Sequence, residues 1–271
     1  MGELDGKVAI VTGGGGGIGG AVAKLLAQRG AAVVVADLLP AAAAVVADAI
    51  TAAGGSALAA GLDVSSEAEV QSLIATVTER FGGIDILHNN AALTDTHPDD
   101  VPLTHLDMDY WDRAMAVNVK GYALMAKHCL PSMVARGGGA IVNTASGAAA
   151  QGDLVRTAYG TSKAAIVGLT KYIASQFGRH NVRCVGIAPG LIATPAVAAA
   201  LTPEMEAMIS SHHLLPRIGQ TSDIAELVAF LVSDRGSFIT GNTIEIDGGF
   251  TAHAPTYSNM VQFFDHMEAH Q

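Results

Sequence analysis

Basic and aromatic residues are scarce in this chain of 271 residues. Lysine and arginine number 15 against 25 aspartates and glutamates, which gives a formal net charge of −10 at pH 7. This charge repels phosphate backbones and anionic lipid headgroups, so we expect neither a nucleic-acid partner nor a membrane-surface partner. Aromatic residues make up 5% of the chain, whereas half of it is hydrophobic and 31 residues are glycine. This composition favours closely packed helices and strands over an all-β sandwich.

Cysteines and long apolar runs are also scarce. The two cysteines, Cys129 and Cys184, stand far apart and show no CxxC or Cys/His spacing. We therefore interpret both as core thiols of a reducing compartment and expect no metal site. No stretch reaches the roughly 18 apolar residues of a membrane-spanning helix, and the first ten residues lack the pattern of a signal peptide. The sequence therefore predicts a soluble cytoplasmic protein.

Short β-branched segments alternate along the chain with longer helical patterns. The predicted strands cover residues 7–11, 32–36, 57–62, 84–88, 140–144, 182–187 and 243–246. The predicted helices cover residues 18–29, 41–53, 67–81, 111–136, 157–177 and 222–232. This alternation is typical of right-handed βαβ units. We expect an α/β fold in which residues 1–250 form a single domain around one doubly wound, parallel, seven-stranded sheet.

Two segments depart from this alternation. Residues 191–220 start with a PGLIATP stretch and are predicted to be an irregular helical insertion that carries the substrate site. Residues 251–271 are predicted to be a C-terminal extension that is partly helical. Its apolar residues recur at helical spacing and need a partner surface: Tyr257, Met260, Val261, Phe264 and Met267. That surface belongs to the same subunit or to a sister subunit, or the extension is a lid over the substrate pocket.

A glycine-rich turn, Thr12 to Gly20, stands between the first predicted strand and the first predicted helix. Such a turn lets backbone amides approach a pyrophosphate, which then lies at the positive end of the helix dipole. A flexible linker is the alternative, but a linker would not stand directly between a strand and an amphipathic helix. The predicted phosphate-binding residues are Gly13, Gly17, Ile18 and Gly19.

Asp37 follows the second predicted strand, about twenty residues beyond the turn, where a carboxylate can bind the ribose hydroxyls of NAD. A 2′-phosphate would meet this negative charge, and the neighbouring Gly16 and Leu38 supply no cation. We therefore predict NAD as the cofactor, with Leu38 as a further contact and a solvated loop aspartate as the alternative. More candidate cofactor residues follow the third and fourth strands: Asp63, Val64, Asn90 and Ala91.

Tyr159 and Lys163 are spaced i,i+4 on a predicted helix, which places the two side chains on one face. Lowering the pKa of tyrosine from about 10 to about 7 requires ~4 kcal/mol of preferential stabilisation of the phenolate. A cation at ~4 Å with an effective dielectric constant of about 20 supplies about this amount. The pair therefore predicts an acid/base tyrosine, and an incidental Tyr and Lys on a helix is the alternative.

Ser146 ends the fifth predicted strand, and Asn118 lies in the preceding long helix. With these residues the sequence resembles the classical short-chain dehydrogenase/reductase family, from about residue 7 to about residue 250. The matching elements are the TGxxxGIG turn, the Asn-Asn-Ala run at 89–91, the tetrad Asn118, Ser146, Tyr159 and Lys163, and the Pro189-Gly190 and Asp247-Gly248-Gly249 elements. One position departs from the family pattern, because Ala92 stands where the family usually has glycine.

The resemblance implies a Rossmann-type fold and a shared mechanism. Tyr159 would exchange the proton of the substrate oxygen, and Ser146 would donate a hydrogen bond to the same oxygen. Lys163 would hold the nicotinamide ribose, and Asn118 would position a water that relays protons. The resemblance also implies a homotetramer with an interface on helices 111–136 and 157–177. The implied contacts at the nicotinamide end are Pro189, Ile192 and Thr194.

The expected substrate pocket is built from residues 93–102, residues 147–151, Leu154, Val155 and the insertion at 191–220. Most of these residues are small or apolar, which indicates an uncharged, cyclic small-molecule substrate. Two arginines are near enough in sequence to bind a carboxylate instead, Arg156 and Arg217. We interpret His212 and His213 as solvated, with a place in the pocket as the alternative.

We therefore predict an NAD-dependent oxidoreductase that interconverts a secondary alcohol and a ketone, such as a hydroxysteroid, a terpenoid or an alicyclic alcohol. One alternative is an NADPH-linked ketoreductase of the 3-oxoacyl type, which the missing cation beside Asp37 disfavours. The other is a catalytically silent NAD-binding protein, which the complete tetrad disfavours.

Overall fold

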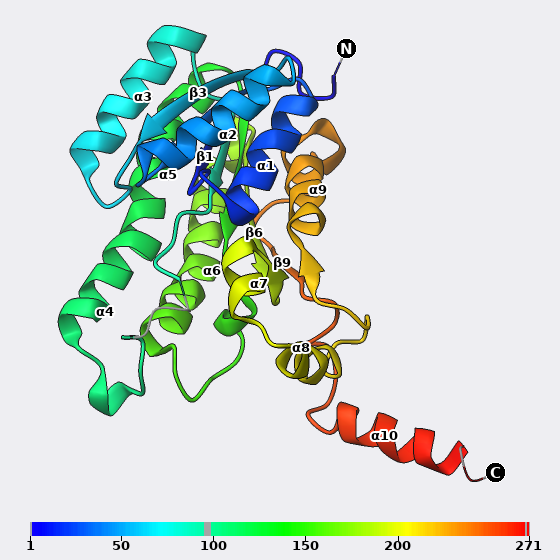
Figure 1. The fold of residues 1–271 in the computed structure, drawn as a ribbon. Helices are drawn as coiled ribbons and strands as arrows, with labels where there is room; N and C mark the ends of the chain where they lie inside the picture. The colour runs from blue at the N-terminus through cyan, green and yellow to red at the C-terminus, as the bar shows by residue number, and fades with distance from the viewer. Residues whose placement is uncertain (1, 95–98, 269, 271) are drawn as a thin grey trace.

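Seven strands form one parallel sheet between two layers of helices in the computed structural model, which describes residues 2–94, 99–268 and 270 (Figure 1). The strands are β1 (Val8–Thr12), β2 (Ala32–Asp37), β3 (Ser56–Gly61), β4 (Ile86–Asn89), β5 (Gly139–Thr144), β6 (Val182–Pro189) and β9 (Thr243–Ile246). They pair in the order β3-β2-β1-β4-β5-β6-β9. The winding reverses between β1 and β4, the switch point at which open α/β sheets bind ligands. The predicted doubly wound sheet is therefore confirmed.

Each face of the sheet carries its own apolar core. One face packs against α1 (Gly17–Gln28), α2 (Pro40–Ala52) and α9 (Thr221–Val232). The other packs against α3 (Glu67–Phe81), α5 (Gly121–Ala135) and α6 (Thr157–Phe177). Side chains alternate between the faces along each strand, so in β1 Ala9 and Val11 join the first core and Val8 and Ile10 join the second. Burial on both faces explains why the strands are continuous apolar runs.

The long helix predicted at 111–136 is interrupted in the structure. Its first part is α4 (Met108–Met115), its last part is α5, and between them lies one π-helical turn, Ala116–Lys120. Single π-helical turns inside α-helices are frequent at functional sites. The turn contains Asn118, which is fully buried.

The insertion was predicted to be irregular and helical, and it contains two short helices, α7 (Pro195–Ala200) and α8 (Pro203–Ser210). Its two ends pair with each other as a small parallel sheet of β7 (Ile192–Ala193) and β8 (Gly219–Gln220). We did not predict this sheet, because two residues are too few to show strand alternation.

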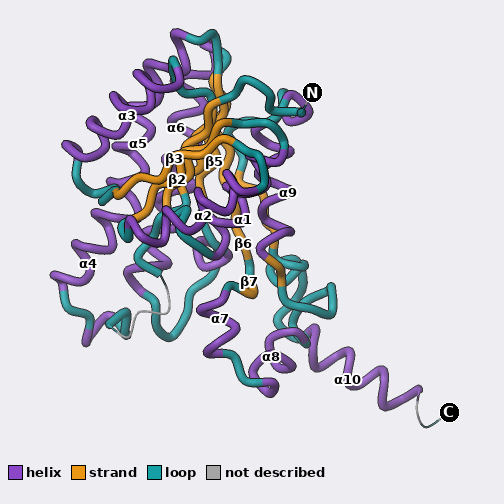
Figure 2. Tube along the Cα trace, turned by 45° about the horizontal axis from the view of Figure 1, so that its top comes forward, coloured by secondary structure: helices purple, strands orange, loops and turns teal. Residues whose placement is uncertain are grey.

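The C-terminal extension ends in α10 (Tyr257–Glu268), which projects away from the rest of the molecule in both views (Figures 1 and 2). The predicted helix is therefore present. Five of its apolar side chains are 39–56% exposed: Met260, Val261, Phe263, Phe264 and Met267. The same subunit therefore leaves most of the predicted apolar stripe uncovered.

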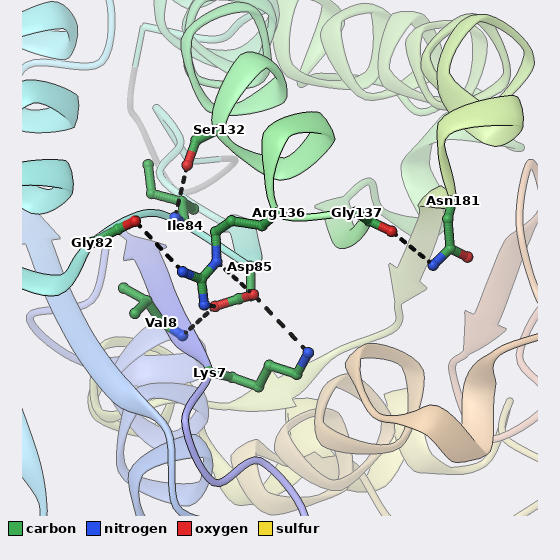
Figure 3. Close-up of polar contacts among 9 residues, drawn as sticks. All are labelled: Lys7, Val8, Gly82, Ile84, Asp85, Ser132, Arg136, Gly137 and Asn181. Atoms are coloured by element: carbon green, nitrogen blue, oxygen red, sulfur yellow. Dashed lines mark hydrogen bonds and ion pairs between the residues drawn. The ribbon is translucent and has the colours of Figure 1, made fainter.

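The buried carboxylate of Asp85 lies at the amino ends of the strands, away from the carboxyl ends where open α/β sheets bind ligands (Figure 3). Asp85 is 6% exposed and accepts hydrogen bonds from the Val8 amide at 2.9 Å and from Nε and Nη2 of Arg136 at 2.9 and 3.0 Å. A two-pronged contact of this kind is strong and directional. These hydrogen bonds connect β1, the start of β4 and the residue after α5, and they hold the three segments together.

Both cysteines are free and buried, which confirms that they are core thiols. Burial raises the pKa of the Cys184 thiol to about 12 and also raises that of Cys129. Among the helices of the described residues, none is both long enough and apolar enough to cross a membrane.

His88 in β4 is a fully buried imidazole. Its Nε2 lies 3.0 Å from Oγ1 of Thr144, and its Nδ1 has no partner in the described residues. Burial, with a smaller effect from the charge of Lys163, lowers the pKa of His88 to about 3. The unfolded chain therefore binds a proton at this residue below pH about 6.5 while the folded chain does not. Acidification from about pH 6.5 towards pH 3 must favour unfolding.

We expect His88→Leu to weaken this acid dependence. The contribution of His88 lowers the free energy of unfolding of the wild type by about 2 kcal/mol between pH 6.5 and pH 5. The variant lacks this contribution. Denaturant unfolding at both pH values measures the difference, with the exposed His180→Gln as the matched control. An unchanged pH dependence in His88→Leu would show that the buried ring does not carry the effect.

Candidate active site

The glycine-rich turn leaves an open space at the start of α1. A Cβ on Gly19 would lie 2.2 Å from the carbonyl oxygen of Gly13, so the turn can only close with glycine at this position. Gly13 itself has φ +62°, in the left-handed region that glycine tolerates. By contrast, no atom lies within 4 Å of the Cβ position of Gly16, which is the N-cap of α1. The first amides of a helix have no partner within it, so those of Gly17 and Ile18 can form a cradle for a pyrophosphate.

Asn90, predicted as a cofactor contact, uses its side chain to hold the turn in place. Its Nδ2 donates to the carbonyl oxygens of Thr12 at 3.1 Å and Gly13 at 3.2 Å. The backbone amides of Asn90 and Ala91 both donate to Oγ1 of Thr12, at 2.9 and 3.1 Å. These bonds join the ends of β1 and β4 across the switch point, so Asn90 shapes the cradle.

Asp37 at the end of β2 is anchored by two backbone amides. Its Oδ2 accepts from Gly15 and its Oδ1 from Leu39, both at 2.9 Å. Each carboxylate oxygen keeps a second lone pair, which can accept from a ribose hydroxyl. The adjacent Leu38 and Leu39 are 68% and 64% exposed and carry no charge. The surroundings of Asp37 therefore match a ribose diol better than a 2′-phosphate.

The two candidates after β3 are positioned by different forces. Oδ1 of Asp63 accepts from the amide and the hydroxyl of Ser65 at 2.9 and 2.7 Å, which fixes the turn. Val64 is 5% exposed and packs so closely on α5 that a Cβ on Gly121 would lie 2.7 Å from Cγ2 of Val64. Val64 therefore contributes mainly to the core at this edge.

The start of the insertion lies against the glycine-rich turn. Cγ2 of Thr194 is 3.4 Å from the Cβ position of Gly17, and Oγ1 of Thr194 accepts from the amide of Val197 at 3.3 Å to begin α7. Ile192 is buried in β7, and Pro189 ends β6. Of the three residues predicted at the nicotinamide end, Thr194 therefore lies beside the cradle.

Lys163 and Tyr159 are held together as predicted, with the ammonium 5.5 Å from the centroid of the phenol ring. Lys163 is only 1% exposed, and its Nζ donates to the carbonyl oxygen of Thr144 at 2.8 Å. Its Nζ also lies 3.5 Å from the hydroxyl of Tyr122. Burial, together with the charge on Tyr159, raises the pKa of Tyr122 well above its ordinary value. Tyr122 therefore stays protonated.

Asn118 joins two parts of the site through its side-chain amide. Its Oδ1 accepts from the amide of Leu93 at 2.7 Å, and its Nδ2 donates to the carbonyl oxygen of Leu93 at 3.1 Å and to Oγ of Ser162 at 2.9 Å. Both amide hydrogens are therefore engaged by the protein. Asn118 fixes the segment after β4 against α6, in the helix turn that follows Tyr159.

Ser146 lies just after β5 at the wall of a cavity of about 480 Å³. Its Oγ accepts from the amide of Ala148 at 3.2 Å, so its own hydrogen remains available for a ligand oxygen. The larger apolar side chains of the cavity come from Leu191, Met208, Ile209 and Phe250, and Ala148 and Pro189 add smaller ones. The lining is more polar than we predicted, because it also includes Gln151, Asp153, Arg156, His212, His213 and Asp247.

Several expectations for the pocket were wrong. Leu154 and Val155 are not among the residues that line the cavity, and their side chains are 87% and 43% exposed. His213 is not solvated, because only 5% of it is exposed. Its Nδ1 donates a hydrogen bond to the carbonyl oxygen of Ile209 at 2.9 Å.

The remaining pocket predictions concern the two arginines and the loop at 93–102, and only Arg156 lines the cavity. Arg156 lines the cavity and pairs with Asp153. Arg217 instead pairs with Asp223 at 2.7 Å, outside this lining. Within 93–102, residues 95–98 lie outside the described residues, and the described part does not line the cavity.

Comparisons with known proteins place the chain in a family. A family model described as enoyl-(acyl carrier protein) reductase matches residues 13–251. A probable short-chain type dehydrogenase/reductase of Bradyrhizobium diazoefficiens is 44% identical over 190 residues, which cover 70% of this chain and 68% of that protein. The chain belongs to the short-chain dehydrogenase/reductase family.

Two further members of the family are steroid enzymes. The 7α-hydroxysteroid dehydrogenase of Bacteroides fragilis is 41% identical over 186 residues, covering 69% of this chain and 71% of that protein. A solved structure of 7α-hydroxysteroid dehydrogenase complexed with NADH and 7-oxoglycochenodeoxycholic acid is 38% identical. It superposes with a TM-score of 0.85 over 91% of this chain and 94% of that one.

The departure from the family pattern at Ala92 does not strain the backbone. Among the described residues other than glycine, only Arg156 and Asn181 have positive φ. The backbone of Ala92 therefore has a conformation that alanine adopts freely.

Asp100 is a site residue that the sequence did not reveal. It is 4% exposed, and its Oδ1 and Oδ2 accept from the backbone amides of Ala158 and Tyr159 at 2.9 and 2.8 Å. Its carbonyl oxygen accepts from the amide of Arg156, which precedes α6 with φ 67°. A carboxylate at the start of a helix satisfies free amides and complements the helix dipole. The sequence contains only an indirect sign of this role. Arg156, which directly precedes α6, provides no capping side chain, so the first amides of the helix need an acceptor from elsewhere in the chain.

We expect Asp100→Ala to loosen the first turn of α6, which carries Tyr159. Loss of a helix cap costs about 1–2 kcal/mol of stability, and the freed amides of Ala158 and Tyr159 should exchange hydrogen faster. Thermal unfolding and amide hydrogen exchange measure the two effects. Asp48→Ala removes an exposed carboxylate from α2 and should change neither. Unchanged exchange at both amides in Asp100→Ala would contradict this role.

Proposed function

We propose that the chain is an NAD-dependent oxidoreductase that interconverts a secondary alcohol and a ketone on a hydrophobic, cyclic substrate. The observation that carries this proposal is the buried ammonium of Lys163, fixed beside the ring of Tyr159 in a family whose members include alcohol dehydrogenases. The cradle at the start of α1 and the carboxylate of Asp37 supply the complementary place for a dinucleotide.

The proton chemistry follows from three side chains. The ammonium of Lys163 is held by the carbonyl oxygen of Thr144, so it keeps its place while Tyr159 gains or loses a proton. A nearby positive charge favours the phenolate, which then accepts the proton of the alcohol. Ser146 donates its free hydrogen to the same oxygen and stabilises the charge that develops there.

The cofactor contributes the other half of the reaction. When bound, NAD supplies the acceptor for the hydride that leaves the alcohol carbon. The chain holds it through the amides at Gly17 and Ile18, the carboxylate of Asp37 and the ammonium of Lys163. Thr194 and Ile192 border the nicotinamide end, beside the cavity that begins at Ser146.

The cavity supports a cyclic substrate. Its volume of about 480 Å³ lies within the range of small-molecule sites, which is about 300–1,000 Å³. Apolar side chains from α8 and Phe250 form part of its wall. Two similar proteins are named as hydroxysteroid dehydrogenases, which supports a secondary alcohol on a fused or single ring.

We further propose a cytoplasmic homotetramer. Free, buried cysteines are consistent with a reducing compartment. An apolar groove of about 650 Å³ between α5 and α6, lined in part by Leu130, Leu169, Ile173 and Phe177, supports one subunit interface there. Light scattering of the purified protein gives the mass that tests the oligomeric state.

A substrate screen at the absorbance of NADH tests the proposed reaction. We expect turnover of cyclic secondary alcohols, including hydroxysteroids, with NAD. Tyr159→Phe should lower kcat by about 10²- to 10⁴-fold, because general acid–base catalysis contributes this much. The variant should still bind NADH, which the change in NADH fluorescence on binding measures. Full activity in Tyr159→Phe would overturn the mechanism, and exclusive turnover of acyl thioesters would overturn the substrate class.

Asp37→Asn tests the choice of cofactor. An asparagine can still accept from the Gly15 amide but lacks the charge that repels a 2′-phosphate. We expect the ratio of kcat/KM for NADP to that for NAD to rise by about tenfold or more, which corresponds to about 1.4 kcal/mol. Asp48→Asn removes the same charge from an exposed position in α2 and should leave the ratio unchanged. A wild-type preference for NADP would refute the assignment of NAD.

A further inference from the structure

The imidazole of His253 lies between two carbonyl oxygens. Its Nε2 is 2.6 Å from the carbonyl oxygen of His212, and its Nδ1 is 2.9 Å from that of Ala254. A carbonyl oxygen only accepts hydrogen bonds, so each contact requires a hydrogen on the ring nitrogen. A neutral imidazole has one such hydrogen, whereas the imidazolium has two. The two contacts therefore exist together only when His253 is protonated.

The surroundings of His253 favour this protonated state. The carbonyl oxygens of Ala254 and His212, and the negative charge of Asp247 after β9, raise the pKa of His253 above its ordinary value, while partial burial opposes them. On the α10 side, the ring stacks on Tyr257 with a centroid distance of 4.5 Å. The segment that follows α8 adds two further titratable side chains, those of His212 and His213.

The contact joins the C-terminal extension to the wall of the proposed substrate cavity. His212 and His213 line this cavity together with Met208 and Ile209 of α8. A second and longer contact joins the same two segments, from Oγ of Ser258 to Oγ of Ser211 at 3.3 Å. His253 thus supplies the short, charge-assisted bond between the extension and the segment that follows α8.

We propose that His253 is a positioning residue for substrate binding: as an imidazolium it ties the extension to His212 and fixes the α8 wall of the cavity, and deprotonation releases one of its two contacts. This inference rests on the proposed function, because it takes the cavity as the substrate site. The tie is complete at pH values below about 6.5, the ordinary pKa of histidine. Because the pKa in the folded chain is raised, both contacts persist until the pH rises through that higher value, above which the ring has one hydrogen for two carbonyl oxygens and the tie is weakened. Alkaline pH should therefore weaken binding of the alcohol and spare binding of NAD.

Kinetics over a pH series test this inference with two substitutions of His253. In the wild type, KM for the alcohol should rise by about tenfold as His253 loses its proton, the scale of one hydrogen bond to a charged group. His253→Leu has no donor, so its KM for the alcohol should be at least as high as that of the deprotonated wild type at every pH, with kcat and the KM for NAD unchanged. His253→Gln keeps one donor without a titration, so its KM should be independent of pH and close to that of the deprotonated wild type. His266→Gln changes an exposed histidine of α10 and should behave as the wild type.

Amide hydrogen exchange gives a readout that does not require turnover. Residues 210–215 should exchange faster in His253→Leu than in the wild type at pH 6, and the difference between the two proteins should shrink at alkaline pH. If exchange responds in this way while the alcohol screen finds no substrate, the tie stands and the proposed function fails. If exchange and the KM for the alcohol are the same in His253→Leu and the wild type across the pH series, the inference is wrong.

Discussion

The hydrogen bond from the ammonium of Lys163 to the carbonyl oxygen of Thr144 is the interaction on which the rest of the site depends. It is 2.8 Å long and lies where only 1% of the lysine is exposed. A charge buried in this way must be held by polar groups, and the end of β5 supplies one in a fixed place. The neighbouring ring of His88 remains neutral because burial and this charge lower its pKa to about 3. Tyr122 remains protonated, and the ring of Tyr159 lies 5.5 Å from the same ammonium.

One stretch of chain after β4 connects the parts that hold this arrangement. Asn90 binds the glycine-rich turn, Leu93 binds Asn118 in the π-helical turn, and Asp100 binds the first turn of α6. Three separate segments are therefore positioned by residues that lie within eleven places of each other in the sequence. This stretch leaves the sheet at the switch point, so the cofactor cradle and the acid/base pair share one structural support.

The sequence predicted what depends on local pattern. The second strand, expected at 32–36, is Ala32–Asp37. The glycine-rich turn and the Tyr159–Lys163 pair are likewise patterns that span only a few consecutive residues. Contacts between distant segments leave no such pattern, which is why Asp100 and His253 could not be found. The π-helical turn was also missed, because one extra residue barely disturbs the helical period. The apolar stripe of α10 predicted a helix, but periodicity alone does not identify the surface that covers it.

The small sheet of β7 and β8 joins the two ends of the insertion, since the amide of Gly219 donates to the carbonyl oxygen of Leu191 at 3.0 Å. The chain therefore leaves the core and returns to it at neighbouring points, whatever lies between them. Residues between β7 and β8, α8 among them, can change in sequence or length without shifting the register of the large sheet or the tetrad. The same feature makes this segment a natural unit for exchange between homologues, so that a new substrate preference can arise on an unaltered catalytic scaffold.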